Sequence, residues 1–279
     1  MNNSLTNINN IVSTFSIFDD LSVLLKLGKQ TSGRKPTLSL SEIATISLIK
    51  SEYGIRNLKG LYKLLKSRFN REFNLPVYKN FVSLMNKDAK LLLVLINTLL
   101  QFNQRKAGII KIIDSTPLPV CKNIRINRHK TCKKIATRGR SSFGWFYGLK
   151  LHAVTDLFGN LLMIKFTTAK TGDRKILDFF LDKLHSSIIL ADAGYASKEL
   201  ERKAAKKGHF LLTCVKRNAK KLTTFLDICL LNLRPRIESV FSVLKERLGL
   251  VTSLPRSIDG YLAHYIHVIF GYLMLKTIS

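Results

Sequence analysis

Apolar residues recur at three- and four-residue spacing over roughly the first third of the chain. From about Ile11 to Lys106 this spacing predicts helices rather than strands. Ser39 and Glu42 have the spacing of a capping box, which marks the start of one helix. The expected helices cover approximately residues 39–50, 56–67, 78–85 and 88–102.

After Gly108 the pattern changes to short apolar runs that are typical of strands. Asp156 followed by Gly159-Asn160 indicates a hairpin turn, and Asp173 is placed to cap a helix. The expected strands cover residues 109–113, 148–155, 161–167, 187–191 and 210–215, with helices over 174–184, 197–207 and about 236–248. This order predicts an α/β fold, a mixed five-stranded sheet flanked by helices. We therefore expect a helical domain over 1–107 and an α/β domain over 108–279.

Two of the N-terminal helices are short and are joined by a turn around Tyr53-Gly54. Basic residues lie on or near the second of them, namely Arg56, Lys59, Lys63, Lys66 and Arg68. This arrangement resembles a helix-turn-helix that binds DNA. An ordinary helical bundle with a solvated basic face has the same pattern, so both interpretations stay open.

Charge changes the picture further, because the chain has 46 Lys and Arg against 18 Asp and Glu, a net charge of +28. No acid occurs between Asp114 and Asp156, and the interval contains Lys122, Arg125, Arg128, Lys130, Lys133, Lys134, Arg138, Arg140 and Lys150. Such an excess favours a polyanionic partner, since each cation bound to a phosphate releases counterions. Trp145 borders this stretch. It can stack on an unpaired base, although packing in the core is the interpretation that we favour.

Three acids stand where carboxylates can gather. Asp114 and Asp192 each follow an apolar strand, and Glu238 lies on a later helix. Ligands of open α/β sheets collect at the carboxyl ends of strands. Three carboxylates with free coordination positions suit Mg²⁺ or Mn²⁺. Two such ions about 3.5–4 Å apart would promote displacement at phosphorus.

At these residues the chain resembles the DDE transposases of bacterial insertion sequences. The similarity rests on Asp114 after its strand, on Ala191-Asp192-Ala-Gly-Tyr195, and on a third motif in which Arg234 precedes Glu238 by four positions and Lys245 follows it by seven. Many members also have a tyrosine three residues before the arginine, where this chain has Leu231.

The resemblance implies a ribonuclease-H-like catalytic core in which Asp114, Asp192 and Glu238 hold divalent metal. It implies cleavage at the element's ends followed by attack of the freed 3′-hydroxyl on target DNA, with Arg234 and Lys245 contacting phosphate. Double-stranded DNA is then the partner, and a homodimer on paired ends is expected. The basic stretch from Lys122 to Arg140 and a second group at Lys216, Arg217, Lys220 and Lys221 are the further DNA-binding candidates.

Other classes remain open or are disfavoured. A non-catalytic DNA-binding descendant would not need all three acids, whereas a metal-dependent nuclease would share the first chemical step.

His129, Cys132 and Cys121 lack the paired spacing of a zinc site, so we interpret them as incidental. Residues 1–10 have no signal-peptide pattern, and 261–275 is too short and interrupted to cross a membrane. We expect a bacterial cytoplasmic, nucleoid-associated protein.

Overall fold

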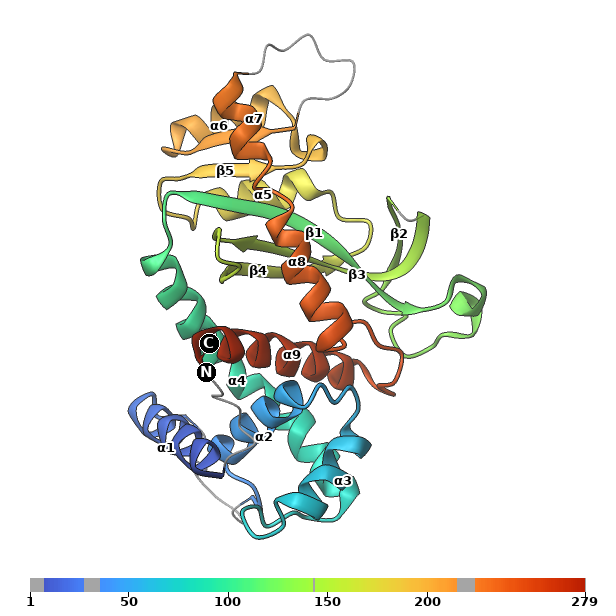
Figure 1. The fold of residues 1–279 in the computed structure, drawn as a ribbon. Coiled ribbons are helices and arrows are strands. Elements are labelled where there is room, and N and C mark those ends of the chain that lie inside the picture. Colours follow the sequence, from blue (N-terminus) through green and yellow to red (C-terminus); the bar gives the residue numbers. More distant parts are fainter. Residues whose placement is uncertain (1–7, 28–35, 143, 215–223, 279) are drawn as a thin grey trace. The chain divides into compact units, whose positions relative to one another are not determined.

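The computed structural model describes residues 8–27, 36–142, 144–214 and 224–278. Contacts divide the chain into two compact units (Figure 1). The helical unit comprises Met1–Thr98, Leu244–Leu250 and Leu254–Ser279, and the sheet unit comprises Leu99–Val243 and Val251–Ser253.

Helices account for the described secondary structure of the helical unit. They are α1 (Ile8–Leu24), α2 (Leu40–Glu52), α3 (Leu58–Arg68), the first part of α4 (Tyr78–Lys106), most of a π-helical turn (Val243–Arg247) and α9 (Ile258–Ile278). The capping box at the start of α2 is confirmed, because the Ser39 hydroxyl accepts from the Glu42 amide while the Glu42 carboxylate accepts from the Ser39 amide. The two helices expected over 78–85 and 88–102 are instead one continuous helix.

The grouping of α9 with the N-terminal helices differs from the domain boundary expected at 107/108. Helix α9 packs against α2, and Gly271 approaches the Ser51 side chain so closely that a Cβ would collide with it. Small residues thus permit the two helices to approach closely. Linear order could not show this, because the two partners are more than two hundred residues apart.

The sheet unit is built on a six-stranded mixed sheet within the described residues, with strand order β2-β3-β1-β5-β6 and β4 paired to β3. The strands are β1 (Ile110–Cys121), β2 (Thr137–Ser141), β3 (Gly144–Thr155), β4 (Leu161–Thr168), β5 (Ile188–Ala191) and β6 (Phe210–Thr213). Strands β1, β5 and β6 are parallel, whereas β2 and β4 pair antiparallel with β3, as does β1. The expected α/β class with a mixed sheet is confirmed.

The sequence pattern did not predict β2, the sixth strand of the sheet. It lies in the basic stretch, where alternating arginines give no apolar periodicity. Gly139 between them lies against the backbone of Ala169, so close that a Cβ would clash. Strand β2 therefore approaches the end of β4 through a residue without a side chain.

Helices α5 (Asp173–Leu181) and α6 (Lys198–Lys206) contribute to the core of this unit, which also includes residues of β1, β3, β4 and β5. The core contains Ile113, Val154, Leu162, Met163, Ile176, Leu177, Phe180, Ile189, Leu200 and Ala204. Helix α7 (Phe225–Leu231) precedes α8 (Arg236–Ser242), which contacts β1. The regular helix expected through Leu248 ends at Ser242 and continues as a π-helical turn, Val243–Arg247.

None of the helices in the described ranges has both the length and the apolar character that crossing a membrane requires.

Candidate active site

Asp114 and Asp192 meet at the point where a parallel ladder ends. Strand β1 pairs with β5 through Ile112 opposite Leu190, and β5 then stops at Ala191. Asp114 and Asp192 each lie two positions beyond this last pair, and the charge of Asp192 acts to raise the pKa of Asp114. The expectation that Asp114 ends its strand is wrong, because β1 continues to Cys121 alongside β3 alone. The parallel pairing that brings the two acids to one sheet edge is present.

Arg234 joins Asp114 to Glu238. Its guanidinium lies 3.2 Å from Asp114 Oδ2 through Nη1 and 3.0 Å from Glu238 Oε1 through Nη2. The arginine and Asp114 side chains are 18% and 20% exposed, whereas Glu238 is 56% exposed. Burial alone would lower the pKa of Arg234, but the charges of Asp114, Asp192 and Glu238 outweigh it and raise that pKa. All three predicted acids therefore act on one cation.

The surroundings of Asp114 disfavour the charged form of its carboxyl group. Burial raises its pKa to about 6, above the ordinary value of 3.8. The Ser115 amide, which donates to Asp114 Oδ1 at 2.7 Å, and the Arg234 charge lower this pKa, while Asp192 and Asp173 raise it. A carboxylate whose pKa is perturbed by burial and named charges at the end of a ladder is a functional-site candidate.

The start of α5 supplies a second polar cluster that sequence reasoning missed. Asp173 is not the helix cap, which is Gly172; its carboxylate instead accepts from Ser115 Oγ at 3.0 Å and pairs with Lys150 Nζ at 3.0 Å. His152 Nδ1 lies 3.6 Å from the same oxygen, and burial lowers the pKa of this histidine to about 4, so it is neutral at pH 7. The scarcity of acids in this chain is the signal that could have drawn attention to Asp173.

The next residue of α5 reaches the turn that follows β5. Arg174 Nε donates to the Gly194 carbonyl oxygen at 3.0 Å. Gly194 lies in the 3₁₀ turn Ala193–Tyr195, which Asp192 caps by accepting from the Ala193 amide at 2.7 Å. Two adjacent residues at the start of one helix thus bind the segments that carry Asp114 and Asp192.

The three predicted acids have the right donors for a hard divalent cation, because carboxylate oxygens suit Mg²⁺ and Mn²⁺. Within the described ranges, however, no group of three or more His, Cys, Asp or Glu side chains is close enough to hold a metal ion. The Arg234 guanidinium contacts both Asp114 and Glu238.

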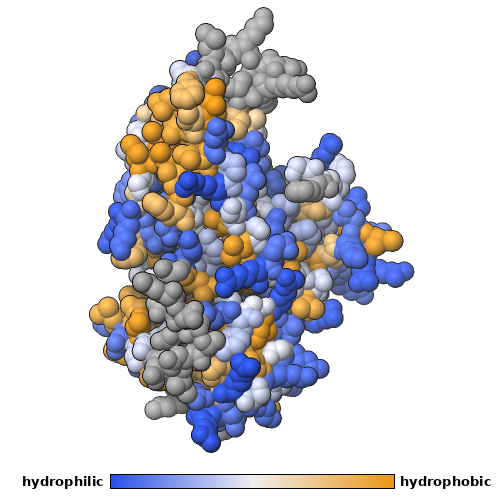
Figure 2. Space-filling view, in the orientation of Figure 1, coloured by the Kyte–Doolittle hydropathy of each residue, from blue (hydrophilic) through white to orange (hydrophobic). Residues whose placement is uncertain are grey.

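The basic stretch is exposed to solvent throughout its predicted DNA-binding residues. These residues are Lys122, Arg125, Arg128, Lys130, Lys133, Lys134, Arg138 and Arg140, and each side chain is exposed. None of them forms an ion pair with a carboxylate in the part of the chain that the structure describes. The segment includes a 3₁₀ turn, Asn123–Arg128, and strand β2, and its surface is largely hydrophilic in the view of Figure 2.

Trp145 lies on this surface rather than in the core, which contradicts the interpretation that we favoured from the sequence. It is 64% exposed and pairs directly with Arg140 across β2 and β3. Its carbonyl oxygen accepts from Asn123 Nδ2 at 2.7 Å, which ties the 3₁₀ turn to β3. An exposed indole therefore lies beside exposed cations.

The remaining candidates fall in different places. Lys216 and Arg217, with Lys220 and Lys221, lie outside the described residues. Lys245 is half-buried in the π-helical turn of the helical unit, so spacing arguments that assume a regular α-helix do not apply to it. In α3 the side chains of Lys59, Lys63, Lys66 and Arg68 are exposed, as both interpretations of this region predict.

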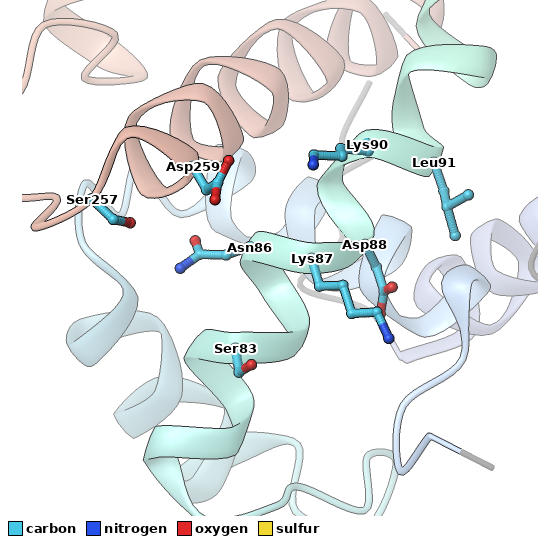
Figure 3. Close-up of a pocket in the computed structure, with 8 residues that line it drawn as sticks. All are labelled: Ser83, Asn86, Lys87, Asp88, Lys90, Leu91, Ser257 and Asp259. Carbon is cyan, nitrogen blue, oxygen red and sulfur yellow. The ribbon is translucent and has the colours of Figure 1, made fainter. Parts of the chain in front are cut away.

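A pocket of about 640 Å³ lies in the helical unit (Figure 3). Helix α4 and the start of α9 form it, and its charged residues comprise two lysines and two aspartates. It is lined by Ser83, Asn86, Lys87, Asp88, Lys90, Leu91, Ser257 and Asp259. None of these belongs to the carboxylate site, and the balanced charges give the pocket no preference for an anion.

The family model described as "Transposase DDE domain" matches residues 104–258, more than half of the chain, and the chain belongs to this family. No curated protein matches the chain.

Solved structures are similar in fold at low identity. The piggyBac transposase in a synaptic complex with hairpin DNA is 9% identical, with a TM-score of 0.52 over 92% of this chain and 70% of that one. The Mos1 transposase paired-end complex with the left transposon end is 11% identical, covering 81% of this chain and 82% of that one, at a TM-score of 0.26. The piggyBac match supports the ribonuclease-H-like core expected from the sequence.

Proposed function

We propose that the protein is the DNA transposase of an insertion sequence, which binds the element's ends, cleaves their 3′ strands and joins them to target DNA. The observation that carries the proposal is the meeting of Asp114 and Asp192 at the end of the β1–β5 ladder, with Glu238 linked to Asp114 through Arg234. This juxtaposition occurs in a chain of the DDE transposase family.

DDE transposases generally use divalent metal ions. In this proposal Asp114, Asp192 and Glu238 would hold two ions of Mg²⁺ or Mn²⁺. Bound metal would polarise the phosphoryl group and lower the pKa of an attacking water. Arg234, released from the carboxylates, would move its charge to a DNA phosphate, for which its planar donors are suited.

The basic surface supports binding of the element's duplex end. Exposed cations on the 3₁₀ turn and β2 would contact phosphates and fix the position of the DNA without reading its sequence. The exposed cations of α3 offer a second surface for the same partner in the helical unit. Two DNA ends must be brought together for transposition, so we propose that the protein acts as a homodimer on DNA.

Neutralising the β2 cations should weaken DNA binding in a salt-dependent way. The double substitution Arg138→Gln and Arg140→Gln should reduce affinity for any duplex and lower the slope of log K against log salt by about 2, one for each lost phosphate contact. Fluorescence anisotropy over a range of NaCl concentrations measures this slope. Lys203→Gln is the control, since Lys203 already pairs with Asp178 and Glu199. A slope equal to that of wild type would exclude β2 from the interface.

Trp145→Ala should discriminate between paired and unpaired DNA. Loss of a stacked base costs about 1–3 kcal/mol, so affinity for ends with unpaired terminal bases should fall while affinity for fully paired duplex is retained. Trp145→Phe is the matched variant and should keep most of the preference. Equal losses for both DNAs would show that the indole contacts the duplex without stacking.

The nature of the 3′ end distinguishes strand transfer from simple cleavage. Duplexes taken from the two flanks of the coding sequence, pre-cut to expose either a 3′-hydroxyl or a 3′-deoxy end, would be incubated with Mn²⁺ and a plasmid target. We expect joining of the 3′-hydroxyl end alone, because its oxygen forms the new bond to phosphorus while a target 3′-oxygen leaves. Cleavage of uncut ends without joining would indicate a nuclease. Binding without either reaction would indicate a non-catalytic relative.

A further inference from the structure

Among the described residues, Asp114 has a strand partner on one side only, Ala153 of β3. Among the described residues, pairing of β1 with β5 ends at Ile112, and from Asp114 onward β1 pairs with β3 only. Asp192 is likewise beyond the end of β5, in a turn. Direct backbone pairing between β1 and β5 thus stops before the two acids, and side-chain contacts add a further link between their segments.

The start of α5 supplies it from the neighbouring layer. Asp173 accepts from Ser115 Oγ, and the amide of the same serine donates to the Asp114 carboxylate. Arg174 donates to the Gly194 carbonyl oxygen, two residues beyond Asp192. The start of α5 thus contacts both segments beyond the point where the ladder between β1 and β5 ends.

The Asp173 carboxylate is itself held in place. Lys150 Nζ pairs with it at 3.0 Å and also donates to the Thr171 carbonyl oxygen at 3.4 Å, and the Lys150 side chain is only 12% exposed. His152 lies beside it with Nε2 2.9 Å from Thr167 Oγ1. Residues of β3 and β4 thereby anchor the carboxylate that anchors Ser115.

We infer that Asp173 and Arg174 are positioning residues that fix the separation of Asp114 and Asp192. Neither needs to touch DNA or metal; Asp173 acts through Ser115, and Arg174 acts through Gly194. The inference rests on the proposed function, because it assigns the two acids a common ligand. Residues that orient ligands in this way typically contribute 10–100-fold to metal affinity or activity.

Direct Mn²⁺ binding, followed by electron paramagnetic resonance, separates this role from the overall reaction. Ser115→Ala, Asp173→Ala and Arg174→Gln should each weaken Mn²⁺ binding and slow joining on the order of 10–100-fold. Asp178→Ala and Lys175→Gln, on the same helix, are the matched controls and should behave as wild type. Urea unfolding of every variant measures the purely structural effect.

Two comparisons test the route through Ser115. The double variant Ser115→Ala with Asp173→Ala should be no worse than Asp173→Ala alone, because both remove one hydrogen bond. Asp173→Asn keeps an oxygen acceptor for Ser115 and should recover much of the Mn²⁺ affinity lost in Asp173→Ala. An asparagine variant as defective as the alanine variant would instead make Asp173 a metal ligand and overturn the inference, as would additive losses.

The same series keeps the two proposals apart. Wild-type protein that binds Mn²⁺ but joins no DNA would contradict strand transfer, and the Mn²⁺ titrations would still decide the positioning role. Active wild type with variants that bind Mn²⁺ normally, or that lose only stability, would contradict the positioning role alone. Wild type that binds no Mn²⁺ would contradict both. A changed DNA affinity in Arg174→Gln would assign that arginine to the DNA surface instead.

Discussion

Asp192→Asn should abolish both cleavage and joining while leaving DNA binding intact. The substitution removes one negative charge and one carboxylate oxygen from the group that acts on Arg234 and would hold the metal. Loss of one electrostatic stabiliser of a transition state costs about 100–1,000-fold in rate, and we expect at least this loss. Labelled element ends incubated with Mn²⁺ and plasmid provide the measurement.

The matched control for this substitution is Glu199→Gln, which removes an acid from the surface of α6. Glu199 is 76% exposed and pairs with Lys203 within its own helix, so its loss should change neither binding nor rate. Residual activity in Asp192→Asn comparable with that of Glu199→Gln would show that Asp192 only caps the Ala193–Tyr195 turn.

Asp114→Asn should abolish activity and at the same time stabilise the metal-free protein at neutral pH. A pKa of about 6 against an ordinary value of 3.8 means that the folded state holds this proton more tightly than the unfolded chain. Stability therefore falls as pH rises from about 4 to 6, and the full penalty, about 3 kcal/mol at most, persists above pH 6. The neutral asparagine escapes this penalty.

Urea unfolding in EDTA at pH 7.5 and at pH 4 checks the sign. The difference between Asp114→Asn and wild type should favour the variant at pH 7.5 and shrink towards zero at pH 4, where the wild-type carboxyl is protonated. Asp182→Asn, which removes a 63% exposed acid paired with Lys207, should show no such pH-dependent difference. A less stable Asp114→Asn at pH 7.5 would mean that the ion pair with Arg234 outweighs burial.

The sheet was predictable because its strands are apolar runs separated by turn residues, and the topology then put Asp114 beside Asp192. The extent of β1 was not. Prolines such as Pro117 and Pro119 are typical of a strand end, yet these two lie where β1 pairs with β3 alone, and a strand with one open edge tolerates missing amide donors. Gly148 lies opposite Pro119 in this pairing. A side chain does not fit at this position, since a Cβ would meet the Leu118 carbonyl oxygen.

The polar contacts of the site were beyond sequence reasoning because their partners are distant in the chain. Arg234 matched a spacing relative to Glu238, but its bond to Asp114 spans 120 positions. Asp173 fits a helix cap by local rules, and its true partners, Ser115 and Lys150, are 58 and 23 positions away. Trp145 was assigned to the core by residue type, whereas the short β2–β3 hairpin leaves it exposed.

The most direct test of the central claim compares wild type with Asp192→Asn at equal occupancy of a pre-cut element end carrying a 3′-hydroxyl. Joining to plasmid would be measured with Mn²⁺ and with EDTA. The proposed function predicts joining by wild type with Mn²⁺ only and none by the variant, although both bind the DNA equally. Joining that persists in Asp192→Asn, or that is unaffected by EDTA, would contradict a carboxylate-dependent transposase.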